Sequence, residues 1–264
     1  MCTYKGNVGN LMQHWTLCEI LTVAQRHASR LSYVDAHAMA PVASVQSERK
    51  DERRQTFDCV RDGRPGRESV YERAWHRLTP NGQGYPNSAA FVEDVWNGRV
   101  SMLLCEMDPS TAAKLRAWAQ GRTEATVIEG DWRTSFKDGL PDAPMTLLSF
   151  DPYSYDRTPS VKKRSYLYPS DLKLIVDALD GVQGGILIQL STYGVKRGDS
   201  QEAVALSVKE ILQKGRLRLA AVVKVNESMM SLVYVRGIDW YADGCGSSSS
   251  TAQGASASGM ARAT

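Results

Sequence analysis

Short apolar runs bounded by turn residues recur along the chain, and each is four to six residues long. Continuous runs of this length are typical of strands buried on both faces of a parallel sheet. They occupy residues 31–34, 100–105, 125–128, 145–150 and 185–190. Helical patterns lie between them, at residues 10–26, 110–120 and 170–179. Because strand and helix alternate, the chain is predicted to form an α/β fold around a parallel sheet.

The last two apolar runs follow a different pattern. Residues 218–225 and 229–235 are separated only by Asn226, Glu227 and Ser228. This spacing suits a hairpin and leaves no room for a crossover helix. The predicted fold is therefore a Rossmann-like, mostly parallel sheet that is closed by an antiparallel C-terminal hairpin.

Two segments fall outside this pattern. Residues 43–84 are polar and rich in Arg and Glu, and we expect them to form a small, mainly helical insertion. Residues 244–264 consist almost entirely of Gly, Ser, Ala and Thr, a composition that buries too little surface to offset its ordering entropy. We expect a disordered tail there, and a main domain formed by residues 1–42 and 85–243.

Composition narrows the class of protein. The five cysteines of the 264 residues are scattered and include no C-x-x-C pair, which indicates reduced thiols and gives no zinc or redox motif. No apolar run reaches the length of a membrane helix, and the N-terminal residues lack the apolar core of a signal peptide. A cytoplasmic monomer with no membrane partner is expected. The net charge of +3 permits a nucleic-acid partner without requiring one.

Acidic residues follow four of the predicted strands. They are Asp35, Glu106, Asp131 and Asp151. Ligands of doubly wound sheets bind beyond the carboxyl ends of the strands, so these acids indicate a nucleoside-bearing ligand. Glu106, at the end of the second strand, is the candidate to accept two hydrogen bonds from a ribose diol. The alternative is that these acids only cap the helices that follow them.

The most specific motif is Asp151-Pro152-Tyr153-Ser154-Tyr155, directly after an apolar strand. Amino-directed methyltransferases carry an acid or Asn, then Pro, Pro and an aromatic residue at this place. The amine of adenine is a poor nucleophile because its lone pair is delocalised into the ring. A carboxylate and a proline carbonyl that accept its N–H bonds favour the more nucleophilic, tetrahedral nitrogen.

In this interpretation Asp151 and Pro152 are catalytic, and Tyr153 or Tyr155 stacks on the base, which must be unpaired or flipped out of its helix. Tyr166 and Tyr168, in the loop that follows, are further candidates to clamp a base. The alternative is a Pro-Tyr turn at a strand end with no catalytic role.

The sequence resembles the bacterial 23S ribosomal RNA adenine-N6 methyltransferases, a family of class I S-adenosylmethionine-dependent enzymes with an antiparallel C-terminal hairpin. The resemblance runs in order along most of the chain. Its six matches are the Gly-Asn stretch 6–14, Asp35-Ala36-His37-Ala38, Tyr85-Pro86-Asn87-Ser88, Glu106 with Pro109-Ser110, Gly130-Asp131 and Asp151-Pro152.

The resemblance implies S-adenosylmethionine as cofactor, ribosomal RNA as partner and direct methyl transfer without a metal. The residues that it places around the cofactor are His14, Asp35, His37, Ser88, Glu106 and Asp131, with Glu106 on the ribose and Asp131 near the adenine amine. Asp151 would orient the target amine, and the arginines of the insertion would help to hold RNA.

The chain departs from the family pattern at three places. Met39-Ala40-Pro41 stand where the family has Gly-Ala-Gly, Gln13 replaces a lysine, and Ser154 occupies the usual aromatic position. Two alternatives therefore stay open: a DNA adenine methyltransferase, and a nucleic-acid-binding protein built on a methyltransferase scaffold that has lost activity. A nicotinamide-dependent oxidoreductase would need Gly-x-Gly-x-x-Gly after the first strand, and residues 37–42 contain none.

Overall fold

The computed structural model describes most of the predicted main domain. The described residues are 8–43, 69–81, 84–122, 124–138, 140–141, 143–157, 163–193, 200–226 and 229–240. The predicted tail, 244–264, and the larger part of the predicted insertion lie outside them. Within these ranges no helix combines the length and the apolar character that crossing a membrane requires.

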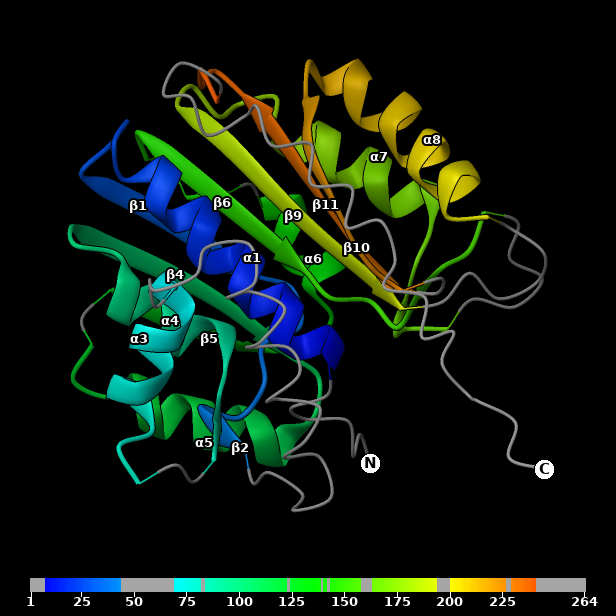
Figure 1. Ribbon diagram of the computed structural model, residues 1–264. Helices are drawn as coiled ribbons and strands as arrows, with labels where there is room; N and C mark the ends of the chain where they lie inside the picture. The colour runs from blue at the N-terminus through cyan, green and yellow to red at the C-terminus, as the bar shows by residue number, and fades with distance from the viewer. Residues whose placement is uncertain are drawn as a thin grey trace, which may run out of the picture.

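A seven-stranded sheet forms the centre of the molecule (Figure 1). Its strands are β1 (Arg30–Asp35), β4 (Arg99–Glu106), β5 (Ala125–Glu129), β6 (Met145–Phe150), β9 (Gly185–Tyr193), β10 (Arg218–Asn226) and β11 (Met229–Arg236). β1, β4, β5, β6 and β9 pair in parallel, while β11 lies antiparallel between β9 and β10. The predicted parallel strands and the predicted hairpin are thus confirmed.

The order of the strands defines the fold. Across the sheet it runs β10-β11-β9-β6-β1-β4-β5. When the seven strands are numbered 1 to 7 in chain order and read from the β5 edge to the β10 edge, the order is 3-2-1-4-5-7-6. This is the doubly wound order 3-2-1-4-5-6 with one final strand inserted antiparallel before the edge. The Rossmann-like fold class predicted from the sequence is confirmed.

Helices cover both faces of the sheet. One face packs against α1 (Val8–Ala24), α3 (Val70–Leu78), α4 (Ser88–Val95) and α5 (Pro109–Ala119); the other packs against α6 (Trp132–Ser135), α7 (Pro169–Ala178) and α8 (Gln201–Leu212). Alternate residues of a strand face opposite sides, so Leu104 joins the first core and Cys105 the second. Single 3-10 turns, η2 (Phe136–Asp138) and η3 (Gln213–Gly215), follow α6 and α8.

The described end of the predicted insertion belongs to the main core. Ser69 and Glu72 form a capping box at the start of α3. Tyr71, Ala74 and Trp75 are buried on its inner face, and α3 contacts α1 and α4. This helix is therefore part of the layer that covers the sheet.

Two small sheets shape the loops at the carboxyl edge. β2 (Val42–Ala43) pairs with β3 (Tyr85–Pro86), and β7 (Ser154–Tyr155) pairs in parallel with β8 (Tyr166–Leu167). The first fixes the segment after β1, and the second fixes the segment after β6. Both lie where a doubly wound sheet binds its ligands.

Candidate active site at the carboxyl ends of the central strands

The four predicted acids lie along one edge of the sheet. Asp35 is the last residue of β1 and Glu106 the last of β4. Asp151 comes directly after β6, and Asp131 is the second residue after β5. In the parallel register Asp35 is opposite Ser149, and Glu106 is opposite Glu129. The strands that carry the acids are neighbours, β6-β1-β4-β5.

Asp35 holds the turn after β1. Its Oδ1 accepts a hydrogen bond from the His37 amide at 3.0 Å, and its Oδ2 accepts one from the Tyr33 hydroxyl at 3.0 Å. Burial raises the pKa of Asp35 to about 6, although the hydrogen bonds from His37 and Tyr33 act in the opposite direction. The carboxyl group is thus a fixed, buried acceptor that sets the position of His37.

His37 connects the end of β1 to the end of β6. Its Nδ1 lies 3.2 Å from the backbone nitrogen of Asp151 and accepts that N–H. Burial, followed by the positive charge of Arg133, lowers the pKa of His37 to about 4, so the ring is neutral at pH 7. A neutral ring that accepts at Nδ1 carries its proton on Nε2. The histidine therefore fixes the backbone of the Asp151-Pro152 pair.

His14 is held in place by contacts with other side chains of the protein. Its Nδ1 lies 2.7 Å from the Tyr85 hydroxyl, and its Nε2 lies 2.9 Å from the Ser88 hydroxyl. The ring stacks on Tyr85 and packs against Phe91. Burial lowers the pKa of His14 to about 3, so it is neutral at physiological pH. Since protein groups occupy both ring nitrogens, His14 joins α1 to β3 and α4. Ser88 is slightly more exposed than His14.

The turn at Met39-Ala40-Pro41 is held by Asn87. The side-chain amide of Asn87 donates to the Met39 carbonyl at 2.9 Å, and its backbone N–H donates to the Pro41 carbonyl at 3.0 Å. Among the residues that the structure describes, Arg216 is the one non-glycine with a positive φ, so this turn uses no left-handed conformation. The turn therefore forms without the glycines found in the family that the sequence resembles.

An open cavity of about 660 Å³ lies beyond β4 and β5. Its lining residues are Leu103, Ile128, Glu129, Gly130, Asp131, Thr134, Ser135, Leu140 and Pro141. The volume lies within the range of small-molecule sites, and the lining combines apolar walls with carboxylates that can accept hydrogen bonds. These features fit the adenosine part of a nucleoside cofactor.

Asp131 and Glu106 both have partners within the protein. Asp131 caps α6 through the Arg133 amide at 3.1 Å and pairs with the Arg133 guanidinium at 3.0 Å. Glu106 accepts the Asp108 amide at 2.8 Å, and burial raises its pKa above the usual value. A carboxylate accepts up to about four hydrogen bonds, so each retains capacity for a ligand. Asp131 can therefore cap a helix and still bind a cofactor, and the contact of Glu106 with Asp108 does not prevent Glu106 from binding one.

The two tyrosines of the Asp151 motif have different environments. Tyr155 is only 4% exposed, packs in the second core, and its hydroxyl lies 3.0 Å from the Ser207 hydroxyl. This burial disfavours Tyr155 as the residue that stacks on a base. Tyr153 is 43% exposed and follows the buried Pro152. Of the two, Tyr153 alone is placed to stack on a ligand.

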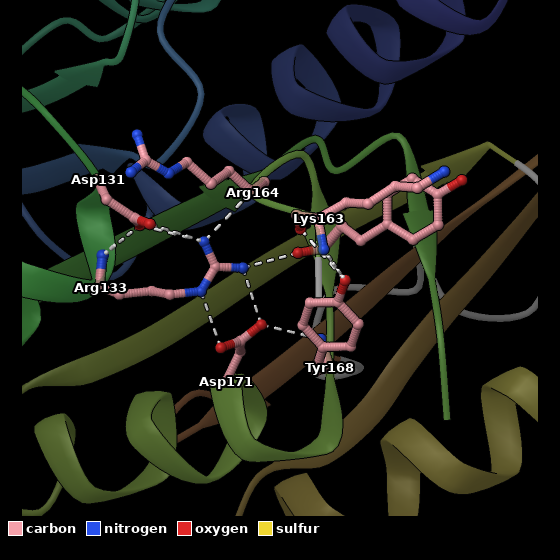
Figure 2. Close-up of polar contacts among 7 residues, drawn as sticks. Asp131, Arg133, Lys163, Arg164, Tyr168 and Asp171 are labelled. Atoms are coloured by element: carbon pink, nitrogen blue, oxygen red, sulfur yellow. Dashed lines mark hydrogen bonds and ion pairs between the residues drawn. The ribbon is translucent and has the colours of Figure 1, made fainter. Parts of the chain in front are cut away.

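Sequence reasoning missed Arg133, which contacts both Asp131, a residue that lines the cavity, and the loop after β6 (Figure 2). The guanidinium lies between the carboxylates of Asp131 and Asp171, with two 2.8 Å hydrogen bonds to Asp171. It also donates to the backbone carbonyls of Tyr166 at 2.6 Å and Arg164 at 3.3 Å. Its place directly after the Gly130-Asp131-Trp132 segment was the one available sequence signal.

Comparison with known proteins supports the fold. No protein-family model and no curated protein sequence matches the chain. A Legionella pneumophila protein assigned to the domain family DUF519 superposes with a TM-score of 0.58 at 17% identity, covering 87% of this chain and 85% of its own. At this identity the likeness establishes a shared fold and leaves the activity open.

Two more distant structures overlap less well. Aeropyrum pernix fibrillarin, crystallised with S-adenosyl-L-methionine, gives a TM-score of 0.37 at 13% identity over 56% of this chain and 60% of its own. A SAM-dependent methyltransferase from Aquifex aeolicus gives 0.37 at 8% identity over 81% and 87%. Neither overlap is close enough to assign residues.

Proposed function

We propose that this chain is an S-adenosylmethionine-dependent methyltransferase that methylates the exocyclic N6 amine of an adenine in RNA. The observation that carries the proposal is the placement of Asp151 and Pro152 at the carboxyl end of β6, with the Asp151 amide bound to His37.

The cofactor site in this proposal is the cavity beyond β4 and β5. Asp131, which lines the cavity, would accept the adenine amine, and the apolar walls would contact the adenine ring. Glu106 is not among the residues that line the cavity; from the end of the neighbouring strand β4 it would accept the ribose hydroxyls. His37 and Ser88, near the turn after β1, would face the methionine end. When bound, the cofactor supplies an electrophilic methyl group on a sulfonium.

The target site is formed by the residues that follow β6. The Asp151 carboxylate and the Pro152 carbonyl accept the two N–H bonds of the amine, which favours a tetrahedral nitrogen. With the cofactor bound, the methyl group would pass from the sulfonium to this nitrogen, and the methylated amine would release one of its protons to solvent. Tyr153, exposed beside Pro152, would contact the RNA strand next to the adenine.

RNA is favoured as the substrate by two features. The sequence resembles the ribosomal RNA adenine methyltransferases along most of its length. The exposed Lys163 and Arg164, in the loop after β6, add positive charge beside the target site. The arginines of the predicted insertion lie outside the described residues, and their role in holding RNA remains a prediction.

Calorimetric titration with S-adenosylmethionine and S-adenosylhomocysteine tests the cofactor site. We expect both to bind the wild-type protein, and we expect Glu106→Gln to weaken binding about tenfold, the equivalent of one lost hydrogen bond to a charged group. Asp151→Asn is the matched control, because that carboxylate faces the target amine and its loss leaves the cofactor affinity unchanged. A wild-type protein that binds neither compound, alone or with RNA present, would instead favour the scaffold without activity.

A further inference from the structure

We propose that Tyr153, Lys163 and Tyr166 form a binding site for an unpaired RNA nucleotide adjacent to the target adenine. These three residues are called the tyrosine platform below. The inference rests on the proposed function for the identity of the target. It adds a second nucleotide site, outside the Asp151-Pro152 pair and the cofactor cavity.

The platform presents two aromatic rings in one orientation. The ring centroids of Tyr153 and Tyr166 are 5.8 Å apart, with planes inclined by 27°, so the rings are stacked. The Lys163 ammonium lies 5.1 Å from the centroid of Tyr166. Tyr153 is one of the few large hydrophobic side chains that the described surface exposes. Stacked rings with an adjacent cation suit a nucleobase and its phosphate.

Backbone contacts hold the two tyrosines in register. The Tyr153 amide donates to the Ser165 carbonyl at 2.8 Å, and Ser154 of β7 pairs with Tyr166 of β8. The two segments are fixed relative to each other by main-chain hydrogen bonds, which side-chain substitutions leave in place. The platform is therefore ordered before a ligand arrives, which reduces the entropy cost of binding.

Two side chains support the loop. Arg133, which is partly buried, binds the carbonyls of Arg164 and Tyr166, and the buried Tyr168 contacts the backbone of Lys163 through its hydroxyl. The burial of Tyr168 excludes the base-clamping role predicted for it. Since Arg133 and Tyr168 also hold the loop, the half-buried ring of Tyr166 is not its sole support.

The platform is close to the target site along the chain. Tyr153 is two residues from Asp151, a separation of at most about 7 Å between Cα atoms. Stacked nucleotides of one strand are spaced by about 3.4 Å. A base on the platform would therefore belong to a nucleotide near the adenine on Asp151. A flanking nucleotide of the same strand can reach it.

The charge of the loop favours a polyanion. Lys163 and Arg164 are consecutive and both are exposed. Stacking alone accepts every base, whereas a phosphate contact adds an affinity that depends on salt. The expected ligand is therefore a single-stranded nucleic acid. The site would bind it through base stacking and through the charge of its backbone, without selecting a particular base.

Fluorescence anisotropy with a labelled single-stranded RNA oligonucleotide tests the platform. Tyr166→Ala is expected to weaken binding about tenfold, the range seen when a base loses its aromatic partner. Tyr166→Phe keeps the ring and is expected to bind like the wild type. Lys163→Ala should reduce the slope of log affinity against log salt by about one, as loss of one phosphate contact does.

Two exposed residues of α8 and η3 serve as matched controls. Leu206→Ala removes an exposed apolar side chain of α8, and Lys214→Ala removes an exposed cation of η3. Neither is expected to change RNA affinity. Thermal melting of every variant identifies any that fail to fold, and Tyr166→Phe then decides whether the ring or the hydroxyl is responsible.

The outcomes separate this inference from the proposed function. The proposal of a tyrosine platform is contradicted if Tyr166→Ala binds the RNA oligonucleotide as tightly as the wild type does. It is also contradicted if the protein binds the single strand and the duplex equally well. Both results would hold even if the protein methylates RNA. A protein that binds no S-adenosylmethionine overturns the proposed function, while a tenfold loss in Tyr166→Ala would still support the platform.

Discussion

Arg133 and Asp171 are joined by two parallel hydrogen bonds, from Nε and Nη2 to the two carboxylate oxygens, each 2.8 Å long. Asp171 is buried in the first turn of α7, where its Oδ2 also accepts the Tyr168 amide at 2.9 Å. The pair connects the segment after β5, which lines the cavity, to the loop after β6. It is the principal side-chain link between the two proposed ligand sites.

Removing the charge of Asp171 is expected to destabilise the protein. Asp171→Asn leaves the Arg133 guanidinium without one of its two carboxylates in a mostly buried site, at a cost of about 3 kcal/mol in the free energy of unfolding. Urea denaturation measures this value. Asp94→Asn is the matched control: Asp94 also binds an arginine, Arg77, through both oxygens, but that arginine is exposed.

The control should lose less than about 1 kcal/mol, as exposed ion pairs do. Equal losses in the two variants would contradict the special role of the Arg133–Asp171 pair. In Asp171→Asn we also expect faster tryptic cleavage after Lys163 and Arg164, because the loop loses its support.

Stability is expected to rise with pH between about 4.5 and 6. His14 and His37 have pKa values lowered to about 3 and about 4 in the folded state, so only the unfolded state binds their protons in this range. Asp35 acts in the opposite sense, because its pKa is raised to about 6 and the folded state keeps the proton. The balance is about one proton taken up on unfolding, or about 1.4 kcal/mol per pH unit.

His14→Gln, which cannot titrate, should bring this slope close to zero. Urea denaturation at several pH values checks it, with His27→Gln, an exposed histidine, as control. A slope unchanged from the wild type in His14→Gln would show that burial does not suppress the protonation of His14.

The two tyrosines of the Asp151 motif should separate activity from stability. Tyr155→Phe loses the hydroxyl contact with Ser207 and is expected to cost about 1 kcal/mol of stability, with methyl transfer retained. Tyr153→Ala removes the exposed ring and should lower methyl transfer about tenfold without changing the melting temperature. Loss of activity in Tyr155→Phe together with full activity in Tyr153→Ala would reverse the assignment.

The strands of the sheet could be predicted because each is a continuous apolar run, and the loop lengths between them decided parallel or antiparallel pairing. Helix α4 was not predicted because six of its eight residues are buried, so it has no polar face that repeats with a helical period. Helix α8 does carry a sequence pattern typical of a helix. Ser200 caps its start, and Val204, Val208 and Leu212 recur every four residues.

Part of the candidate site could also be predicted from the sequence. The four acids lie at one sheet edge because parallel strands share a direction, so each strand end delivers its next residue there. The Arg133–Asp171 pair could not be predicted, since it joins residues 38 positions apart through the path of a loop. The burial of Tyr155 depends on its packing in the core near α8, which no local pattern reveals.

The most direct test of the proposed function is methyl transfer to RNA from S-adenosylmethionine that carries a labelled methyl group, followed by digestion and nucleoside analysis. We expect label in N6-methyladenosine with the wild-type protein, and at least a hundredfold less with Asp151→Ala, as when one donor or acceptor of the transition state is lost. Label in any other nucleoside, or equal label from Asp151→Ala, would contradict the account.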